Sequence, residues 1–311
     1  MELKDCLLVP SNDHIVEQLS KHYSELSPYY KMAVPTPDKL EQIVDKWHLT
    51  KLASTIGIPT PKTCLPDNIE QASQFRYPLL IKGRRGLSFY KSFHRKAITS
   101  NNYNELQTLV SDSLLHECII QELVTNSDNR VVSFTCFSID GDIKSHWVGV
   151  KLREHPPRLG TATLAQSIPD PGLLAYGQAL TKALCYTGIC EIEFMWDETD
   201  KQYKLIEINP RTWLWVELAK ACGIDYAKML YNHLQSEPQS YPATYHTGLK
   251  WINTFTDLPY ALHSILNRQL TIREYLKSLD GKKNHAIWNF HDPLPTIMLP
   301  LLSPTILKHR R

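Results

Sequence analysis

The segment from residue 190 to residue 211 constrains the fold more than any other part of the sequence. Two apolar runs, CEIEFMWD and YKLIEINP, flank a short polar turn, which is the pattern of a β-hairpin. Alternate residues of a strand point to the same face, so Glu191 and Glu193 share one face of the first strand. By the same rule, Glu207 and Asn209 share one face of the second strand. The sequence therefore predicts acidic and amide side chains gathered on one face of an apolar hairpin.

Glu193, Glu207 and Asn209 are predicted to hold a metal ion. Strand alternation lets them converge across the hairpin, and two carboxylates with an amide oxygen are hard ligands that suit Mg²⁺ better than Zn²⁺. Glu207 lies in the apolar run Leu205–Ile208, where an unpaired carboxylate would be costly. The alternative, a solvent-facing hairpin with ordinary surface acids, does not explain these apolar surroundings. Arg211 follows at the strand end, where its guanidinium can reach a phosphate.

Two further segments predict contacts to a nucleotide. Lys82 ends an apolar strand and can meet the α- and β-phosphates as a point charge, although many strands end in lysine. The second segment follows another buried strand and can offer backbone groups to an adenine edge; its residues are Gln121, Glu122, Leu123 and Val124. Asp128 comes shortly afterwards, where it could bind a ribose hydroxyl. The alternative for this second segment is an edge strand followed by a polar loop.

The composition is that of an ordinary globular protein and argues against a nucleic-acid partner. The 311 residues suffice for two or three domains, and 34 Lys and Arg against 32 Asp and Glu leave no strongly basic excess. The seven cysteines include no CxxC pair, which argues against a structural zinc site and favours a reducing, cytoplasmic compartment. Neither a signal peptide nor a run of 18 apolar residues is present, so no transmembrane segment is expected.

The periodicity of the chain predicts a mixture of helices and strands. Short strands are expected at residues 6–9 and 31–34, with a helix over 14–23 between them, and one long helix is expected over 40–56. The Asp-Gly pair at 140–141 predicts a tight turn between two further strands. The other expected elements are strands at 78–83, 97–99 and 118–124 and helices at 103–110, 172–184 and 215–221.

The last part of the chain, from about Gly248, is expected to be mainly helical. Thr271 and Glu274 form the pattern of a capping box at a helix start. The tail from Pro295 is apolar and ends in basic residues, but it is short and contains three prolines, so it does not suit a membrane span. We expect it to pack on the core, with docking on a membrane surface as the alternative.

Lys82, the segment around Glu122 and the hairpin acids, taken in this order, resemble the ATP-grasp superfamily. Asp45-Lys46 and the stretch Gly57–Pro61 also match the entry segment of that superfamily. The resemblance covers the chain from about residue 6 to its end. It implies an α+β fold with the nucleotide between two subdomains, ATP with Mg²⁺ or Mn²⁺ as cofactors, and Lys46 and Lys82 on the phosphates.

The segment 151–167 narrows the resemblance to the predicted ATP-dependent carboligases, relatives of D-aspartate ligase and of carbamoyl-phosphate synthase domains. In that group Lys151, Arg153 and Arg158 look placed to meet phosphates or the substrate carboxylate; the alternative for them is a solvated charged loop. The implied activity joins a small-molecule carboxylate to an amine through an acyl phosphate, which Arg211 would stabilise. A non-catalytic ATP-binding subunit and an ATP-grasp kinase are the alternatives.

The resemblance also implies three parts: a shortened preATP-grasp portion at 1–40, the ATP-grasp domain at 41–240 and a mainly helical extension at 241–311. The first part offers two short strands at most. We therefore expect a homodimer to complete it, the alternative being coverage by the extension. The expected phosphate-covering loop at 83–96 contains only two glycines, so ATP binding is better supported than turnover.

Overall fold

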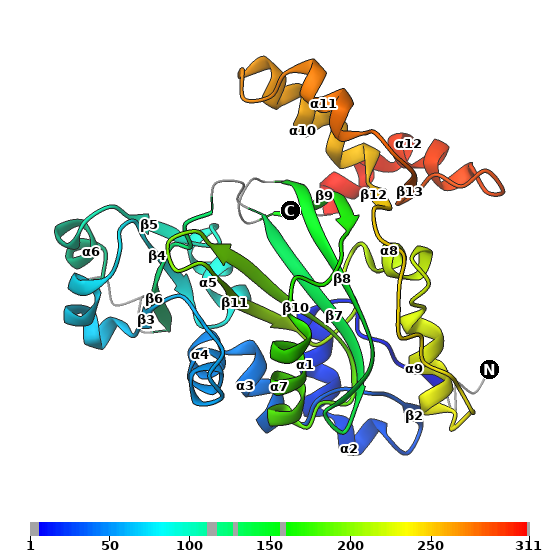
Figure 1. The fold of residues 1–311 in the computed structure, drawn as a ribbon, viewed down its shortest axis with the longest axis horizontal. Helices are drawn as coiled ribbons and strands as arrows, with labels where there is room; N and C mark the ends of the chain where they lie inside the picture. The colour runs from blue at the N-terminus through cyan, green and yellow to red at the C-terminus, as the bar shows by residue number, and fades with distance from the viewer. Residues whose placement is uncertain (1–5, 111–116, 127–129, 156–159, 310–311) are drawn as a thin grey trace.

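The structure, a computed structural model, describes residues 6–110, 117–126, 130–155 and 160–309. Two sheets lie side by side, and helices pack around the larger one (Figure 1). The larger sheet has the strand order β11-β10-β7-β8-β9-β12-β13, and its neighbours are antiparallel except for β12 and β13. Its strands are β7 (Val131–Ile139), β8 (Asp142–His155), β9 (Thr161–Ser167), β10 (Gly188–Asp197), β11 (Gln202–Asn209), β12 (Lys250–Ile252) and β13 (Lys283–His285).

The smaller sheet is antiparallel, with the strand order β3-β6-β4-β5. Its elements are β3 (Thr63–Cys64), η1 (Pro66–Gln74), β4 (Leu79–Gly83), α5 (Gly86–Phe93), β5 (Ile98–Ser100), α6 (Tyr103–Val110) and β6 (Cys118–Glu122). A separate apolar core fills it, including Leu79, Ile81 and Leu106. The backbone N–H of Glu198 donates to the carbonyl of Thr125 (2.8 Å), which joins the end of the smaller sheet to the turn of the hairpin β10–β11.

The two faces of the larger sheet are covered differently. One face packs against α7 (Leu174–Leu184), where a Cβ on Gly177 would lie 2.3 Å from the ring of Phe134, so only glycine permits this contact. The other face carries an aromatic core that includes Trp147 and Trp215, under α8 (Val216–Ala221) and α9 (Tyr226–Leu234).

The single helix expected over residues 40–56 is two helices, α3 (Pro37–Val44) and α4 (Lys46–Thr55). Asp45 breaks it with an extended backbone, and its Oδ1 accepts the N–H groups of Trp47 (2.9 Å) and His48 (3.1 Å). This is an N-cap that satisfies donors the new helix would otherwise leave free. The break places Lys46 in the first turn of α4.

The segment expected to be a phosphate-covering loop contains the helix α5. Phe89 is buried, and its ring lies 4.5 Å from that of Phe93. A Cβ on Gly83 would come within 2.4 Å of the Cβ of Phe89, so the glycine is needed for this helix to pack against β4. The apolar spacing of GLSFYKSF thus decides the local structure, and Gly83 just before it serves packing.

The N-terminal portion is small. It contains β1 (Cys6–Leu7), α1 (Asp13–Lys21), α2 (Tyr23–Leu26) and β2 (Tyr30–Lys31). β1 and β2 pair in parallel as a sheet of two strands. The alternative that the C-terminal extension covers this sheet is wrong, because the extension lies at the opposite end of the molecule (Figure 1).

The extension contains α10 (Thr254–Leu266), α11 (Ile272–Ser278) and α12 (Leu294–His309), and it also adds β12 and β13 to the larger sheet. The capping box of Thr271 and Glu274 is formed at the start of α11. The expectation that the tail packs on the core is wrong for its described side chains, since Leu294, Ile297 and Leu301 are 61%, 57% and 69% exposed. Among the described residues, every helix is too short or too polar to cross a membrane.

Candidate functional site

The hairpin β10–β11 places four polar side chains on one face of the larger sheet. Glu193 lies opposite Glu207, and Glu191 lies opposite Asn209. A register shift follows Glu193, so the alternation of the hairpin changes just beyond the acids. The three predicted metal ligands therefore come from two cross-strand pairs that are neighbours on the same face, separated by the pair of Ile192 and Ile208 on the other face.

Lys151, from β8, reaches across the intervening strand to this cluster. Its Nζ lies 2.7 Å from Glu193 Oε1, and the two side chains are only 11% and 9% exposed. Burial acts to lower the pKa of Lys151, but the carboxylates of Glu193 and Glu191 outweigh it and hold that pKa above its usual value. Burial raises the pKa of Glu193 even in the presence of this lysine.

Glu191 is a member of the cluster for which the sequence suggested no role. Its Oε1 accepts the hydroxyl of Ser133 (2.8 Å), and its Oε2 accepts the Nδ2 of Asn209 (3.1 Å). Burial, followed by the charge of Glu193, raises its pKa to about 7. The bond to Nδ2 fixes the amide of Asn209 so that the oxygen points away from Glu191. The sequence contained a signal for this residue, namely its place two residues before Glu193 on the same face.

Arg211 connects the site to the N-terminal portion. Its Nε lies 2.5 Å from Asp13 Oδ1, and its Nη2 donates to Asn209 Oδ1 at 3.2 Å. Burial acts against the charge of the guanidinium, but Asp13 raises the pKa of Arg211 overall. Sequence reasoning missed Asp13, which is 198 positions away along the chain.

Two lysines from separate elements face Glu207. The Nζ of Lys46 lies 4.0 Å from Glu207 Oε2. Burial and then the charge of Lys46 lower the pKa of Lys82 to about 7, with Glu207 acting in the opposite direction. The side chain of Glu207 is 37% exposed, rather than buried as its apolar run had indicated. Burial still acts to raise its pKa, but the lysines outweigh this and hold the pKa below its usual value.

The predicted adenine segment lies at the end of β6, and its side chains have structural partners. Gln121 donates to the hydroxyl of Thr63 (2.8 Å). The buried carboxylate of Glu122 accepts the backbone N–H of Arg76 (2.8 Å) and lies 3.7 Å from the Nζ of Lys62. Backbone groups are therefore what this segment can offer a base, and Leu123 already donates its N–H to the carbonyl of Pro78.

Three other predicted residues are not brought into the cluster. Arg153 forms a bidentate ion pair with Asp257 of α10 (2.8 and 2.7 Å) and contacts the hydroxyl of Ser278. Its position therefore serves the attachment of the extension rather than a phosphate. Asp128 and Arg158 lie outside the described residues.

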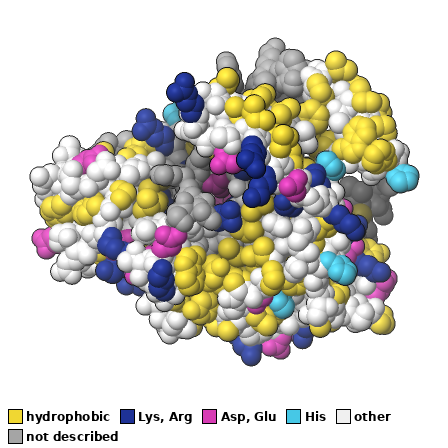
Figure 2. Space-filling model, turned by 45° about the horizontal axis from the view of Figure 1, so that its top comes forward, with side chains coloured by type: hydrophobic (Ala, Val, Ile, Leu, Met, Phe, Trp, Pro, Cys, Tyr) yellow, Lys and Arg dark blue, Asp and Glu magenta, His cyan; other side chains and the backbone are white. Residues whose placement is uncertain are grey.

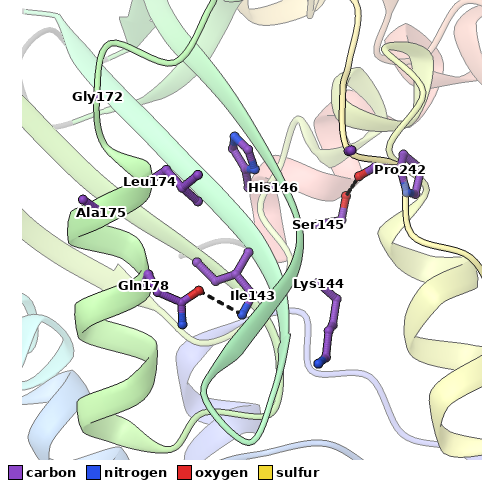
Figure 3. Close-up of a pocket in the computed structure, with 10 residues that line it drawn as sticks. Ile143, Lys144, Ser145, His146, Gly172, Leu174, Ala175, Gln178 and Pro242 are labelled. Atoms are coloured by element: carbon purple, nitrogen blue, oxygen red, sulfur yellow. Dashed lines mark hydrogen bonds between the residues drawn. The ribbon is translucent and has the colours of Figure 1, made fainter.

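A separate hollow of about 680 Å³ lies between the start of β8 and α7 (Figure 3). The polar groups that line it are largely paired with one another. Ser145 donates to the carbonyl of Pro242 (2.8 Å), and the side chain of Gln178 accepts the N–H of Ile143 (3.3 Å). None of the predicted site residues lines this hollow, so it does not extend the cluster.

Sequence comparison finds similarities that include the following two. Residues 173–232, which include the hairpin, match the family described as "Carbamoyl-phosphate synthase L chain, ATP binding domain". The D-aspartate ligase of Enterococcus faecium is 22% identical over 225 residues, which cover 67% of this chain and 53% of that protein. The chain thus spans about half the length of this curated relative.

Structure comparison finds the same fold in solved structures that include the following two. The biotin carboxylase domain of Hydrogenobacter thermophilus 2-oxoglutarate carboxylase, solved as a dimer with MgADP and bicarbonate, matches with a TM-score of 0.60 at 17% identity, over 76% of this chain and 55% of that one. Staphylococcus aureus N5-carboxyaminoimidazole synthetase matches with a TM-score of 0.59 at 16% identity, over 81% and 66%. The α+β ATP-grasp fold is confirmed, together with the resemblance that predicted it.

Proposed function

With an ATP-grasp fold as the premise, we propose that this chain is an ATP-dependent carboxylate–amine ligase that converts Mg-ATP to ADP and phosphate. One observation carries the proposal: Glu193, Glu207 and Asn209 lie on one sheet face, where Lys46, Lys82 and Lys151 from three other parts of the chain meet them together with Arg211 from the end of the hairpin. Cations beside hard oxygen ligands suit a substrate that brings both phosphate charge and a metal ion.

Glu193, Glu207 and Asn209 would hold Mg²⁺, with Mn²⁺ as an alternative that has similar ligand preferences. The residues fit such an ion because the donors are all oxygens and Glu207 is open enough to be reached. Glu193 is instead neutralised by Lys151, so this lysine must share the carboxylate with the ion or turn toward phosphate. When bound, the metal would supply positive charge that offsets the repulsion between triphosphate and carboxylate.

The nucleotide would lie between the two sheets. Lys82 and Lys46 would contact the phosphates, and the backbone between Glu122 and Val124 would meet the edge of the adenine. The hairpin turn supports this placement, because the backbone N–H of Glu198 donates to the carbonyl of Thr125, the residue directly after Val124. The base and the phosphates would therefore each find partners within one continuous region.

The reaction needs two displacements. A carboxylate oxygen of the first substrate attacks the γ-phosphorus, the bond from that phosphorus to the bridging oxygen breaks, and ADP leaves with that oxygen. The amine nitrogen then attacks the carbonyl carbon of the acyl phosphate, the bond to the phosphate oxygen breaks, and phosphate leaves as the nitrogen releases a proton to water. Arg211, already against Asn209, would stabilise the charge on the acyl phosphate. No covalent intermediate with the protein is required.

A panel experiment tests this proposal. The chain is incubated with Mg-ATP and pairs of carboxylates and amines, including D- and L-amino acids, and ADP, phosphate and amide are measured. Hydroxylamine, used as the amine, would trap an acyl phosphate as a hydroxamate. Release of ADP and phosphate that depends on both substrates supports the ligase. A stable phosphorylated product would instead identify a kinase, and Mg-ATP binding without ADP across the panel would favour a non-catalytic subunit.

We also propose that the chain forms a homodimer through its N-terminal portion. The two-stranded sheet is too small to be stable alone, and Val9 and Tyr29 beside it are 48% and 59% exposed. Light scattering at low micromolar concentration should give twice the chain mass of 35.8 kDa. A monomer that still turns over ATP with its substrates would contradict this proposal.

A further inference from the structure

Helix α10 has its apolar side turned outward. The residues it buries are small or polar, namely Asp257, Ala261 and Ser264. Its exposed row consists of large apolar residues at helical spacing: Phe255 (36%), Leu258 (43%), Leu262 (53%) and Leu266 (82%). A helix on the surface of a globular protein normally shows the reverse arrangement. The outer row therefore indicates a surface that another apolar body covers.

The rest of the extension continues this apolar surface. Ile272 and Leu276 on α11 are 62% and 59% exposed, and Phe290, in the segment before α12, is 86% exposed. The described side chains of α12 add Leu294, Ile297, Met298, Leu301 and Leu302, all at least 37% exposed. Figure 2 shows hydrophobic side chains gathered at the upper right, on the part of the molecule that the extension forms. Exposed apolar side chains that gather in one part of a molecule often mark an interaction site.

The extension is also the basic part of the chain. Residues 254–311 contain eight Lys and Arg against four Asp and Glu, a net charge of +4, whereas the whole chain carries +2. One of the four acids, Asp257, is buried in its pair with Arg153. On α11, Arg273 and Lys277 are each one residue after an exposed apolar residue, so a basic row runs beside the apolar row. After Asp292 the sequence contains no further acid and ends in Lys-His-Arg-Arg.

We propose that α10, α11 and α12 dock on the surface of an anionic lipid bilayer. Exposed apolar rows beside basic side chains are the arrangement by which helices lie in the interface between headgroups and acyl chains. Trp288 and Phe290, whose rings lie 5.5 Å apart, are aromatic residues of the kind that favour that interface. A second copy of this chain would bring two surfaces of equal positive charge together, whereas anionic headgroups attract both. The 16 residues of α12 would lie along the surface rather than cross it.

Sedimentation with lipid vesicles tests the proposal on the full chain. The chain should sediment with vesicles of phosphatidylglycerol and phosphatidylcholine in equal parts, and much less with phosphatidylcholine alone or at high salt. The double change Leu262→Glu and Leu266→Glu, and separately Arg273→Glu and Lys277→Glu, should each lower the partition coefficient about tenfold or more, since each basic residue near an anionic surface contributes about 1 kcal/mol. Tyr231→Glu, at an apolar residue of α9 that is 48% exposed and lies outside the extension, is the matched control and should bind as the unchanged chain does.

The temperature of unfolding is measured for every variant, and only variants that keep it are compared. If the unchanged chain stays in the supernatant with the anionic vesicles, the proposal is wrong. It is equally wrong if both pairs of changes leave binding as it was. A dimer in solution that Leu262→Glu and Leu266→Glu dissociate, without vesicle binding, would show that a second copy covers this surface instead. ATP binding is not an outcome here, so these results do not depend on the proposed ligase activity.

Discussion

The molecule contains two clusters of buried charge, and they differ in how well their charges are satisfied. Near the hairpin turn, Asp197 is paired with Lys204 (2.7 Å) and Arg76 (3.0 Å). Burial acts to raise the pKa of Asp197, but its partners lower it to about 2. In the candidate site the balance is reversed, since Glu191 and Lys82 both have their pKa moved to about 7, toward the uncharged form.

This difference separates a structural network from a site prepared for a ligand. In the first cluster each charge already has its partner, so nothing is gained when a ligand arrives. In the second, Lys151 is paired with Glu193, but Glu191 and Lys82 are moved toward their uncharged forms, and an added metal ion and polyanion would relieve both kinds of unfavourable charge. Groups with strongly shifted pKa values often mark functional sites for this reason. The contrast predicts that changes in the first cluster alter stability, while changes in the second alter binding.

The largest effect is expected for Glu207→Ala. Removing this carboxylate should weaken Mg-ATP binding by more than about 2 kcal/mol, because a charge-assisted contact to the metal is lost. The temperature of unfolding should change little, since the side chain is 37% exposed. Calorimetric titration of the variant, with Glu70→Ala on the exposed surface as the matched control, measures this directly. A folded variant that binds Mg-ATP as well as the unchanged chain would show that the metal assignment is wrong.

Asp197→Asn should destabilise the fold by about 2 kcal/mol at neutral pH, because the carboxylate titrates at about 2 in the folded chain instead of near 4. The folded pKa is depressed, so this stabilisation is complete above about pH 5 and is lost as the pH falls toward 2; about half remains at pH 3. Urea unfolding of both chains between pH 3 and pH 7 checks the effect. Asp200→Asn, on the same turn but 38% exposed, should cost much less. An unchanged difference across this pH range would contradict the assignment.

Lys82→Ala should weaken ATP binding about tenfold or more and leave adenosine binding unchanged, because only the phosphates would contact the ammonium group. Parallel titrations with the two ligands separate the outcomes. An equal loss for both would indicate a folding defect rather than a phosphate contact.

A smaller effect should appear in the protons that accompany binding. With a pKa of about 7, Lys82 is about one-tenth protonated at pH 8 before a polyanion raises its pKa. Mg-ATP binding should then take up close to one proton at pH 8, and at pH 6 this uptake by Lys82 should nearly vanish while Glu191, with its pKa of about 7, releases a proton as the metal ion binds. Calorimetry in buffers of different ionisation enthalpy counts these protons, and Lys82→Ala should abolish the uptake. Equal uptake at both pH values would mean that Lys82 is already charged in the free protein.

Local periodicity was sufficient to predict the hairpin and its shared face, because the alternation of β-strands is a property of the backbone. It was not sufficient at Asp45, where the apolar spacing continued through a capping residue that starts a new helix. It also missed α5, since glycines near a lysine suggested a loop while Phe89 and Phe93 decided for a helix. Competing local signals, rather than absent ones, caused both differences.

The full set of residues around the site was harder to predict than the hairpin acids at its centre. Whether Arg153 faced a phosphate or a partner depended on Asp257, 104 positions away, and Asp13 is further still from Arg211. The alternation of side chains along a strand can identify which residues share a face. It cannot identify which distant acid neutralises an arginine. The exposure of Glu207 had the same origin, because β11 is the edge strand of the larger sheet, a position that the pairing of distant strands decides.

The pair of Arg153 and Asp257 has a practical consequence for shortening this chain. Lys151 and Arg153 are two residues apart on β8, so the anchor of the extension and a lysine of the site share one short stretch of strand. Cutting the chain before Asp257 would leave a buried guanidinium without its acid, only about 7 Å along the strand from Lys151. Loss of ligase activity after such a cut would report damage to β8 and not a role of the tail. A cut placed after Ala286 keeps Asp257, Ser278 and strand β13 and removes α12 with its exposed side chains, so it is the deletion that can be interpreted.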